Sequence, residues 1–212
     1  MRKIFIDGGA HCGCSRRHFR KEYDPTNEWE IFSFEPNPLM QQYCGDLIQK
    51  ALWVHNKKTT LYRYYKSGGS TINISKNNLL SHRRRELAGI FAREDDEFIP
   101  KMVYDEIECQ CIDIDEFIRQ NFSNNDLIYL KLDVEGSEYG ILEHLLEKNT
   151  MQYIDKLFIE WHGIRRNVVI KNQNVNMVRK GDPDLTEKIQ TLKIPIDDTW
   201  NAMKVDLCRF PR

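Results

Sequence analysis

Short apolar runs alternate with amphipathic segments along most of the chain, and this order predicts strands that are connected by helices. Residues 4–6 form the first run, which ends in a turn with two glycines, and residues 15–23 are typical of the helix that would follow. The expected strands are residues 4–6, 30–35, 51–54, 59–65, 103–112, 127–132, 156–161 and 200–210. The expected helices are residues 15–23, 38–48, 113–121, 137–146 and 185–192.

An alternation of this kind predicts an α/β domain with a Rossmann-like fold. We expect a mainly parallel, seven-stranded sheet with helices on both faces, because helices separate successive strands. Residues 59–65 alternate between apolar and polar side chains, which favours a strand at an edge of the sheet. Residues 200–210 are expected to close the sheet as a reversed strand.

Length and composition predict one domain over residues 1–212, because 212 residues with 41% hydrophobic side chains suffice for one buried core. Residues 77–98 interrupt the pattern with runs of arginine and of acidic residues, which indicates an exposed helical insertion or lid. A solvated surface helix is the simpler interpretation of that segment. Residues 167–184 are expected to be mostly loop. The chain starts almost on its first strand, which suggests a domain excised from a larger protein.

The charge balance argues against a polyanionic partner, because 31 basic and 32 acidic residues leave a formal charge of -1. We therefore expect no nucleic acid partner. No apolar run approaches the ~18 residues that span a bilayer. No signal peptide is evident, so we expect a cytoplasmic protein without a membrane span. The six cysteines do not have zinc-knuckle spacing and are expected to be reduced thiols.

Two polar motifs follow the first two core strands. The segment from Asp7 to Gly13 is rich in small residues that let the backbone approach a ligand closely, although a glycine-rich turn also serves helix packing. Glu35 ends the second strand 22 residues after Gly13, and a carboxylate there can accept hydrogen bonds from both hydroxyls of a ribose. Since parallel sheets bind ligands beyond these strand ends, both motifs predict a cofactor that contains ribose.

Two acidic motifs follow the later strands. Asp133, Glu135 and Glu138 crowd the end of a buried strand, and such like charges cost stability unless a cation, hydrogen-bond donors or a proton compensates them. Glu160 and His162 follow the next strand. A lone histidine is more often structural, but a position among the strand ends gives a functional role equal weight.

These four motifs, in this order, resemble the FkbM family of S-adenosylmethionine-dependent methyltransferases. The resemblance runs from Ile4 to about Gly163 and is most specific at residues 131–138, Lys-Leu-Asp-Val-Glu-Gly-Ser-Glu, and at residues 34–38, Phe-Glu-Pro-Asn-Pro. It implies a class I methyltransferase fold and S-adenosylmethionine as cofactor. The implied cofactor-binding residues are Asp7, Gly9, Ala10, His11, Gly13, Glu35, Pro36, Ala51, Leu52 and Asp133.

The resemblance also implies which part of the cofactor each of these residues contacts. The glycine-rich turn would hold the methionine part, Glu35 would bind the ribose, and Ala51 and Leu52 would lie beside the adenine. His11 stands where the family often has asparagine. Residues 112–117 resemble the family's Leu-Asp-Asp element, for which we favour a structural role.

Transfer of a methyl group from a sulfonium to a hydroxyl requires in-line alignment and removal of the hydroxyl proton. Asp133, Glu135 and His162 are the candidate catalytic residues, with Asp133 or His162 as the base. The alternative is that Asp133, Glu135 and Glu160 hold a divalent metal such as magnesium, which would acidify the hydroxyl. Metal-free catalysis is favoured over this alternative.

The sequence therefore predicts an O-methyltransferase that acts on a hydroxyl of a sugar or glycan. Association with other glycan-modifying domains, covalent or non-covalent, would fit this role. A nicotinamide-dependent Rossmann oxidoreductase is the alternative enzyme class, because it shares the first turn and the ribose-binding acid, but it gives no reason for residues 133–138. A non-catalytic cofactor-binding domain of a larger assembly is the third interpretation.

Overall fold

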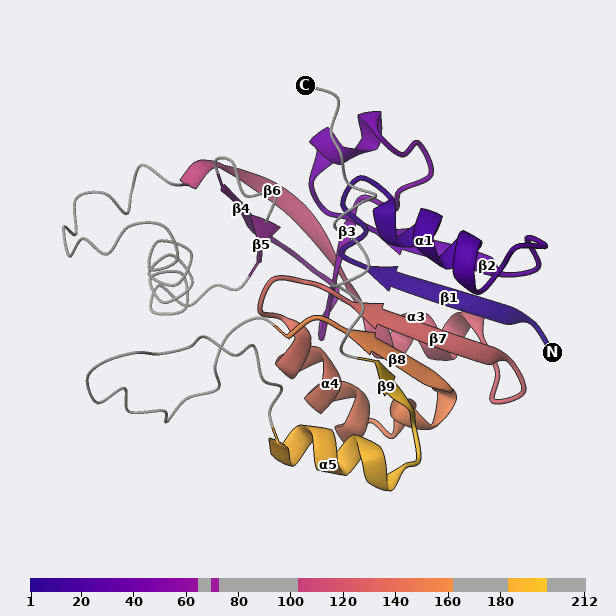
Figure 1. Ribbon diagram of the computed structural model, residues 1–212. Coiled ribbons are helices and arrows are strands. Elements are labelled where there is room, and N and C mark those ends of the chain that lie inside the picture. The colour runs from indigo at the N-terminus through magenta and orange to yellow at the C-terminus, as the bar shows by residue number, and fades with distance from the viewer. Residues whose placement is uncertain (65–69, 73–102, 162–182, 198–212) are drawn as a thin grey trace, which may run out of the picture.

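The computed structural model describes residues 1–64, 70–72, 103–161 and 183–197, and these contain a five-stranded parallel sheet (Figure 1). The strand order is β2-β1-β7-β8-β9, and each pair of neighbours is parallel. Its strands are β1 (Lys3–Gly8), β2 (Glu30–Phe34), β7 (Leu127–Leu132), β8 (Lys156–Ile159) and β9 (Ile196–Asp197). The central strands are almost entirely buried, as expected of a sheet whose faces are covered.

Alternate side chains of the sheet enter different cores, because successive residues of a strand point to opposite faces. Phe5 packs on Phe19 of α1 (Cys14–Glu22), with ring centroids 3.9 Å apart. Ile4 and Ile6 instead join the larger core. That core includes buried residues of α3 (Ile114–Asn121), α4 (Glu138–Glu147) and α5 (Pro183–Thr191). Figure 1 shows α1 on one side of this sheet and α4 and α5 on the other.

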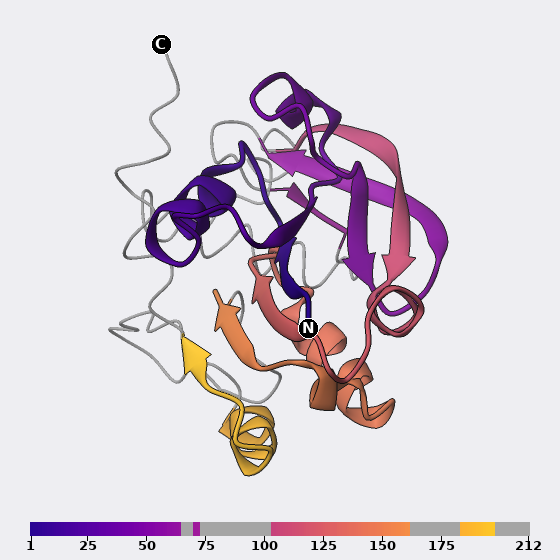
Figure 2. The same ribbon diagram turned by 90° about the vertical axis from the view of Figure 1, so that its right-hand side faces the viewer.

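A second, four-stranded sheet has the order β3-β6-β4-β5. Its strands are β3 (Lys50–Trp53), β4 (Lys57–Tyr64), β5 (Ser70–Thr71) and β6 (Val103–Asp113). The β3 and β6 strands are parallel, whereas β4 is antiparallel to both of its neighbours. A single parallel bridge between Phe34 and Ile48 joins the two sheets just before β3, and Figure 2 shows the long strands of the second sheet beside the first.

The sheet arrangement differs from the single seven-stranded sheet that the sequence suggests. The described residues form sheets of five and four strands, of which the first is parallel throughout. The strand expected at an edge, β4, lies between β6 and the short β5. The expected closing strand at 200–210, the charged insertion at 77–98 and all but the end of the loop at 167–184 lie outside the described residues.

The helix expected at 38–48 is shorter than its sequence suggests. It consists of the 3-10 helix η1 (Pro38–Gln42), which begins after Asn37, whose side chain accepts a hydrogen bond from the Leu39 amide. The helix cannot extend to Ile48, because Ile48 donates to the Ser33 carbonyl at 2.8 Å and accepts from the Glu35 amide at 3.0 Å. These bonds require an extended backbone beside β2. Sheet pairing therefore overrides the local helix signal.

Two further expectations concern the thiols and the membrane. Cys14 is disulfide-bonded, so the expectation of reduced thiols is wrong for this residue, whereas the other described cysteines, Cys12, Cys44, Cys109 and Cys111, are free. Among the described residues, no helix combines the length and the apolar character that a membrane crossing requires.

Candidate active site

The first two motifs of the sequence and the acidic loop meet where the strand order reverses. The chain passes from β1 to β2 on one side, and β7 pairs with β1 on the other. Ligands of open α/β sheets bind outside the carboxyl ends of the strands at such a point. Gly9 has a φ of +73°, and a Cβ built on it would lie 1.8 Å from the carbonyl oxygen of Asp133. Only glycine allows this approach of the two loops.

The glycine-rich turn is fastened to the neighbouring strand by its own amides. The amides of Gly9 and Ala10 both donate to the Phe34 carbonyl at 3.0 Å. Gly13 then closes the turn with a 2.8 Å bond to the Ala10 carbonyl and adopts a φ of 76° at the start of α1. The turn is thus a fixed support at the ends of β1 and β2. Since Gly9 and Ala10 use their amides internally, the turn would accommodate a ligand by its shape.

Glu35 lies directly after β2 and is buried, with 6% of its surface exposed. One carboxylate oxygen accepts from the His11 amide at 2.9 Å and the other from the Asn37 amide at 2.9 Å. His11 reaches this position through a left-handed backbone, with a φ of 49°. A carboxylate oxygen has two acceptor positions, so each oxygen keeps one for a ligand hydroxyl.

Burial raises the pKa of Glu35 to about 7, although the Asn37 and His11 amides and the charge of Lys131 favour its ionised form. The charge of Asp133 acts with burial to raise this pKa. A carboxyl group with its pKa near neutrality changes its charge in the physiological range, and such groups are common at functional sites.

An ion-pair group around the fully buried Lys131 lies beneath the turn. Lys131 of β7 places its ammonium 3.1 Å from Asp7 of β1 and 3.4 Å from Asp133. The Ser15 hydroxyl donates to the two carboxylate oxygens of Asp7 at 2.8 and 2.7 Å. Asp7 is 0% exposed, so it supports the turn from below, whereas the side chain of Asp133 keeps 16% of its surface exposed. Asp133 is thus the carboxylate of this group that remains accessible.

The loop after Asp133 is held in shape by Glu138, which is fully buried. Its carboxylate accepts from the amides of Val134 and Gly136, both at 2.9 Å. Glu135 has a φ of 53° and Gly136 a φ of 98°, a backbone that costs about 1 to 3 kcal/mol at a non-glycine residue. The crowded carboxylates of this segment are therefore compensated by an ammonium at Asp133 and by amides at Glu138. Glu135 stays half-buried on the loop.

The remaining residues expected in the site lie close to these loops or outside the described chain. Glu160 follows β8, is half-buried, and donates its amide to the Leu132 carbonyl at 2.9 Å. His162 lies outside the described residues. Within the described chain, Asp133, Glu135 and Glu160 do not gather into a group with the spacing of metal ligands.

The residues expected beside the adenine lie on β3. Leu52 is buried in the larger core, and its Cδ1 lies 2.9 Å from the position of a Cβ built on Gly8. Ala51 is buried on the opposite face of the strand, in the core of the second sheet. Pro36 is half-buried after Glu35. Leu52 thus lies at the end of β1, whereas Ala51 packs in the core of the second sheet.

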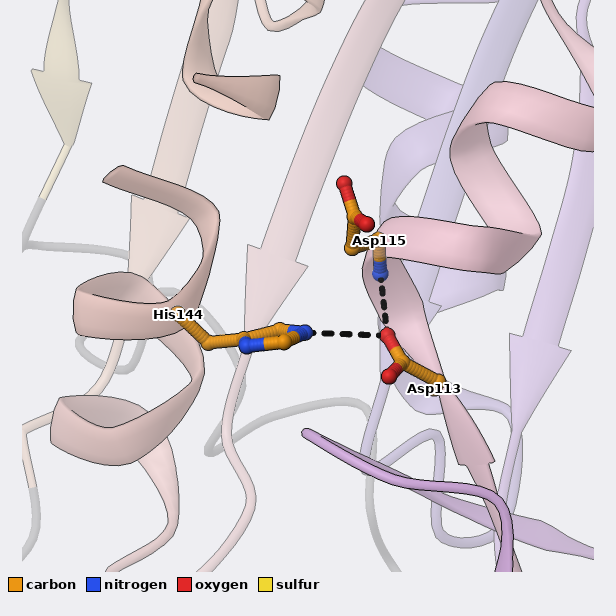
Figure 3. A group of neighbouring side chains, drawn as sticks. All are labelled: Asp113, Asp115 and His144. Carbon is orange, nitrogen blue, oxygen red and sulfur yellow. Dashed lines mark hydrogen bonds and ion pairs between the residues drawn. The ribbon is translucent and has the colours of Figure 1, made fainter. Parts of the chain in front are cut away.

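One group of the described residues does have the spacing of metal ligands, namely Asp113, Asp115 and His144 (Figure 3). Its contacts explain it without an ion. Asp113 caps α3 by accepting from the amides of Asp115 and Glu116, and it also accepts from or pairs with His144 at 3.0 Å. Hydrogen bonds from Thr150 and Arg119 outweigh the effect of burial and lower the pKa of Asp115. The structural role favoured for residues 112–117 agrees with these contacts.

Two residues of the site had no assigned role in the sequence analysis. Lys131 interrupts an otherwise apolar strand, and a charged residue in a buried strand indicates an ion pair. Ser15 sits eight residues after Asp7, and nothing in the sequence marks it as the partner of that carboxylate. The sequence therefore contains a signal for the ion pair of Lys131 but none for the hydrogen bonds of Ser15.

Comparison with known proteins identifies the family of the chain. The family model described as the methyltransferase FkbM domain matches residues 7–180, which include the glycine-rich turn, Glu35 and the acidic loop. No curated protein and no solved structure matches the chain. A family of methyltransferases favours methyl transfer over the oxidoreductase alternative. Since the match covers well over half of the 212 residues, the chain belongs to the FkbM methyltransferase family.

Proposed function

We propose that this protein is an S-adenosylmethionine-dependent O-methyltransferase that acts on a hydroxyl of a sugar or glycan. The observation that carries the proposal is the contact between the Gly9 turn and the Asp133 carbonyl at the reversal of strand order. It brings a partly exposed carboxylate beside the turn on which a cofactor would rest.

The residues at this edge fit S-adenosylmethionine. Gly9 and Gly13 have positive φ values and no side chains, so the turn can stay compact beside a ligand. Glu35 keeps an acceptor position on each oxygen for the two ribose hydroxyls. The ion-pair group of the described residues contains the carboxylates of Asp7 and Asp133 and the ammonium of Lys131, which favours a cationic ligand over an anionic one.

When bound, S-adenosylmethionine would supply an electrophilic methyl group on a cationic sulfur. Asp133 is the proposed base, because it ends the buried strand beside the turn and has an exposed edge. It would take the proton of the acceptor hydroxyl as the oxygen forms its bond to the methyl carbon. The carbon–sulfur bond breaks in the same step and leaves its electron pair on sulfur. Lys131 and the Gly8 carbonyl, which accepts from the Asp133 amide at 3.1 Å, keep Asp133 in place.

The family resemblance supports a sugar or glycan acceptor, and an accessible carboxylate suits an alcohol acceptor in general. Alcohol oxygens are poor nucleophiles while protonated, so a carboxylate beside the methyl group has a clear purpose. His162 is the competing base and Glu135 a supporting acid. Neither nucleic acid nor a membrane is expected as a partner. Other glycan-modifying domains remain the proposed associates, and a cytoplasmic location is proposed with them.

The test is methyl transfer from S-adenosylmethionine with a labelled methyl group to a panel of free and nucleotide-linked sugars. Asp133→Asn keeps the shape of the side chain and removes its charge, so turnover should fall by a factor on the order of 10² or more. Affinity for the neutral product S-adenosylhomocysteine in calorimetry should stay within about twofold, since the lost charge acts on the cationic cofactor and on the reacting oxygen. His162→Ala should lower turnover less than Asp133→Asn.

The matched control is Glu147→Gln, the same chemical change at an exposed residue at the far end of α4. Its turnover should equal that of the unmodified protein. A chelator distinguishes a carboxylate base from carboxylate metal ligands. Only an enzyme that depends on a metal would lose activity with the chelator and regain it with magnesium. Full turnover by Asp133→Asn would show that the chemistry lies elsewhere.

A further inference from the structure

The buried ammonium of Lys131 takes no part in the proton transfer proposed above. Its residue is 0% exposed, and its Nζ lies within hydrogen-bond distance of two backbone carbonyls, 3.1 Å from Gly8 and 2.7 Å from Gly9. Both carbonyls belong to the turn at the end of β1. A lysine in the centre of a sheet is costly unless it is paired, so the place of Lys131 in β7 depends on its partners in this site.

The charge of Lys131 is set by the two carboxylates beside it. Burial lowers its pKa, but the charges of Asp7 and Asp133 and their hydrogen bonds outweigh burial, so the pKa lies above its ordinary value. The group therefore combines two carboxylates and one ammonium in a region that is mostly buried. Charges at such a site interact strongly with a charged ligand, because little solvent screens them.

The charge of the cofactor changes during the proposed reaction. S-adenosylmethionine has a cationic sulfonium, whereas its product, S-adenosylhomocysteine, has a neutral sulfur. Two unopposed carboxylates would favour the cationic form strongly. An ammonium fixed between them reduces that preference, since it cancels one of the two negative charges.

We propose that Lys131 is a positioning residue that fixes the glycine-rich turn against Asp133 and sets how strongly the site prefers the cationic cofactor over its neutral product. The inference rests on the proposed function, because it requires that S-adenosylmethionine binds at this turn. The inference adds to that function a residue that controls the relative affinity for S-adenosylmethionine and S-adenosylhomocysteine.

Calorimetry with S-adenosylmethionine and with S-adenosylhomocysteine tests this proposal without any methyl acceptor. The measured quantity is the ratio of the Kd of S-adenosylhomocysteine to that of S-adenosylmethionine. Lys131→Met keeps the volume of the side-chain stem and removes one positive charge, so the ratio should rise by on the order of tenfold. Asp7→Asn removes one negative charge and should lower the ratio by a similar factor.

The double variant Asp7→Asn/Lys131→Met keeps the proposal testable if Lys131→Met alone does not fold. It removes both charges of the buried pair, and such a neutral replacement is often tolerated. Asp133 then loses its ion pair with Lys131, but its partly exposed side chain can be hydrated. The ratio in the double variant should return to within about twofold of the unmodified protein, because the net charge is restored.

The control is Lys21→Met, which removes an ammonium from an exposed lysine whose side chain is 75% exposed, in the last turn of α1. It should leave the ratio unchanged. If Lys131 had a purely structural role, its loss would weaken the binding of both ligands equally and leave the Kd ratio unchanged. The inference is therefore overturned if the double variant has the same Kd ratio as Asp7→Asn. Failure of the unmodified protein to bind either ligand would instead refute the proposed function itself.

Discussion

Burial and the neighbouring groups together determine the pKa of single residues in this site. Glu35 and Lys131 are both enclosed, yet the first has its pKa raised to about 7 and the second keeps its charge. The difference lies in their partners. Glu35 receives two neutral amides, which only partly offset burial, whereas Lys131 faces two carboxylates.

Replacing Glu35 should weaken cofactor binding without removing the fold. Glu35→Ala loses both acceptors for the ribose hydroxyls, so the affinity for S-adenosylhomocysteine in calorimetry should fall by roughly 1.5 to 3 kcal/mol, the range for hydrogen bonds to charged groups. Glu35→Gln retains one carbonyl acceptor and should lose less. Unchanged affinity in Glu35→Ala would remove the ribose assignment.

The raised pKa of Glu35 predicts a pH dependence of binding. Only the carboxylate accepts two hydroxyl hydrogens, so the Kd of S-adenosylhomocysteine should decrease by about tenfold between roughly pH 6 and 8. Lys131 and Asp133 are the charged groups that also act on Glu35. The Glu35→Gln profile should be flat over this range, and an equally steep profile in that variant would assign the titration to another group.

The same shift has a defined sign for stability. The pKa of Glu35 is higher in the folded protein than its ordinary value, so folding favours the protonated form. Its stabilising contribution in the absence of ligand is therefore present at acid pH and is lost as the pH rises through about 7. Ligand binding, which favours the carboxylate, should be most evident as thermal stabilisation at the alkaline end of this range.

At the level of elements, the site depends on how closely two loops approach each other. The turn after β1 and the loop after β7 meet at Gly9, and Glu138 fixes the second loop through its two amide bonds. The acidic residues of that loop are thus partly structural. The crowding of these carboxylates marks the loop as a candidate site, because each charge needs a compensating partner and these partners come from different strands and turns.

The approach of these loops can be tested at Gly9. Gly9→Ala places a methyl group against the Asp133 carbonyl at a φ that alanine tolerates poorly, so the free energy of unfolding should fall by about 1 to 3 kcal/mol. Cofactor affinity should fall as well, because the turn must move away from β7. Gly45→Ala is the matched control, since a Cβ there meets no atom within 4 Å. Equal stability of the two variants in denaturant unfolding would contradict the described contact.

The α3 cap predicts an effect on stability that is separate from the cofactor. Asp113→Ala removes the acceptor for the amides of Asp115 and Glu116, so unfolding should be easier by about 1 kcal/mol, within the range for lost caps. Asp113→Asn keeps an amide oxygen as the cap and should lose less. Thermal melts measure both variants. A melting temperature that rises with added manganese or zinc in the unmodified protein would show that the group binds a metal after all.

Sequence patterns predicted the strands and turns that carry the site because these depend on local signals. The limits of β7 match the apolar run 127–132, and Glu35 and Asp133 follow their strands as expected. Pairing between distant segments was not predicted: Ile48 joins Phe34 instead of extending a helix, and the two-residue β9 has no apolar run of its own. The ion pair of Lys131 with Asp7 also required the register of β1 and β7.

For the molecule as a whole, the strand order determines where the candidate active site lies. The described strands β2 and β7 flank β1, so the residues at their carboxyl ends converge at one edge of the sheet. Family membership indicates a methyl transfer, and the cofactor that we propose for this edge is cationic and contains ribose. The second sheet extends the structure beyond β2, and its strand β3 brings Leu52 against Gly8 at the end of β1.

The central claim is that this edge binds S-adenosylmethionine, and calorimetry against NAD tests it most directly because the oxidoreductase alternative shares the glycine-rich turn and Glu35. The account predicts one-to-one binding of S-adenosylmethionine that is tighter than binding of NAD by about a hundredfold or more. Tighter binding of NAD, or no binding of S-adenosylmethionine by a folded protein, would contradict it.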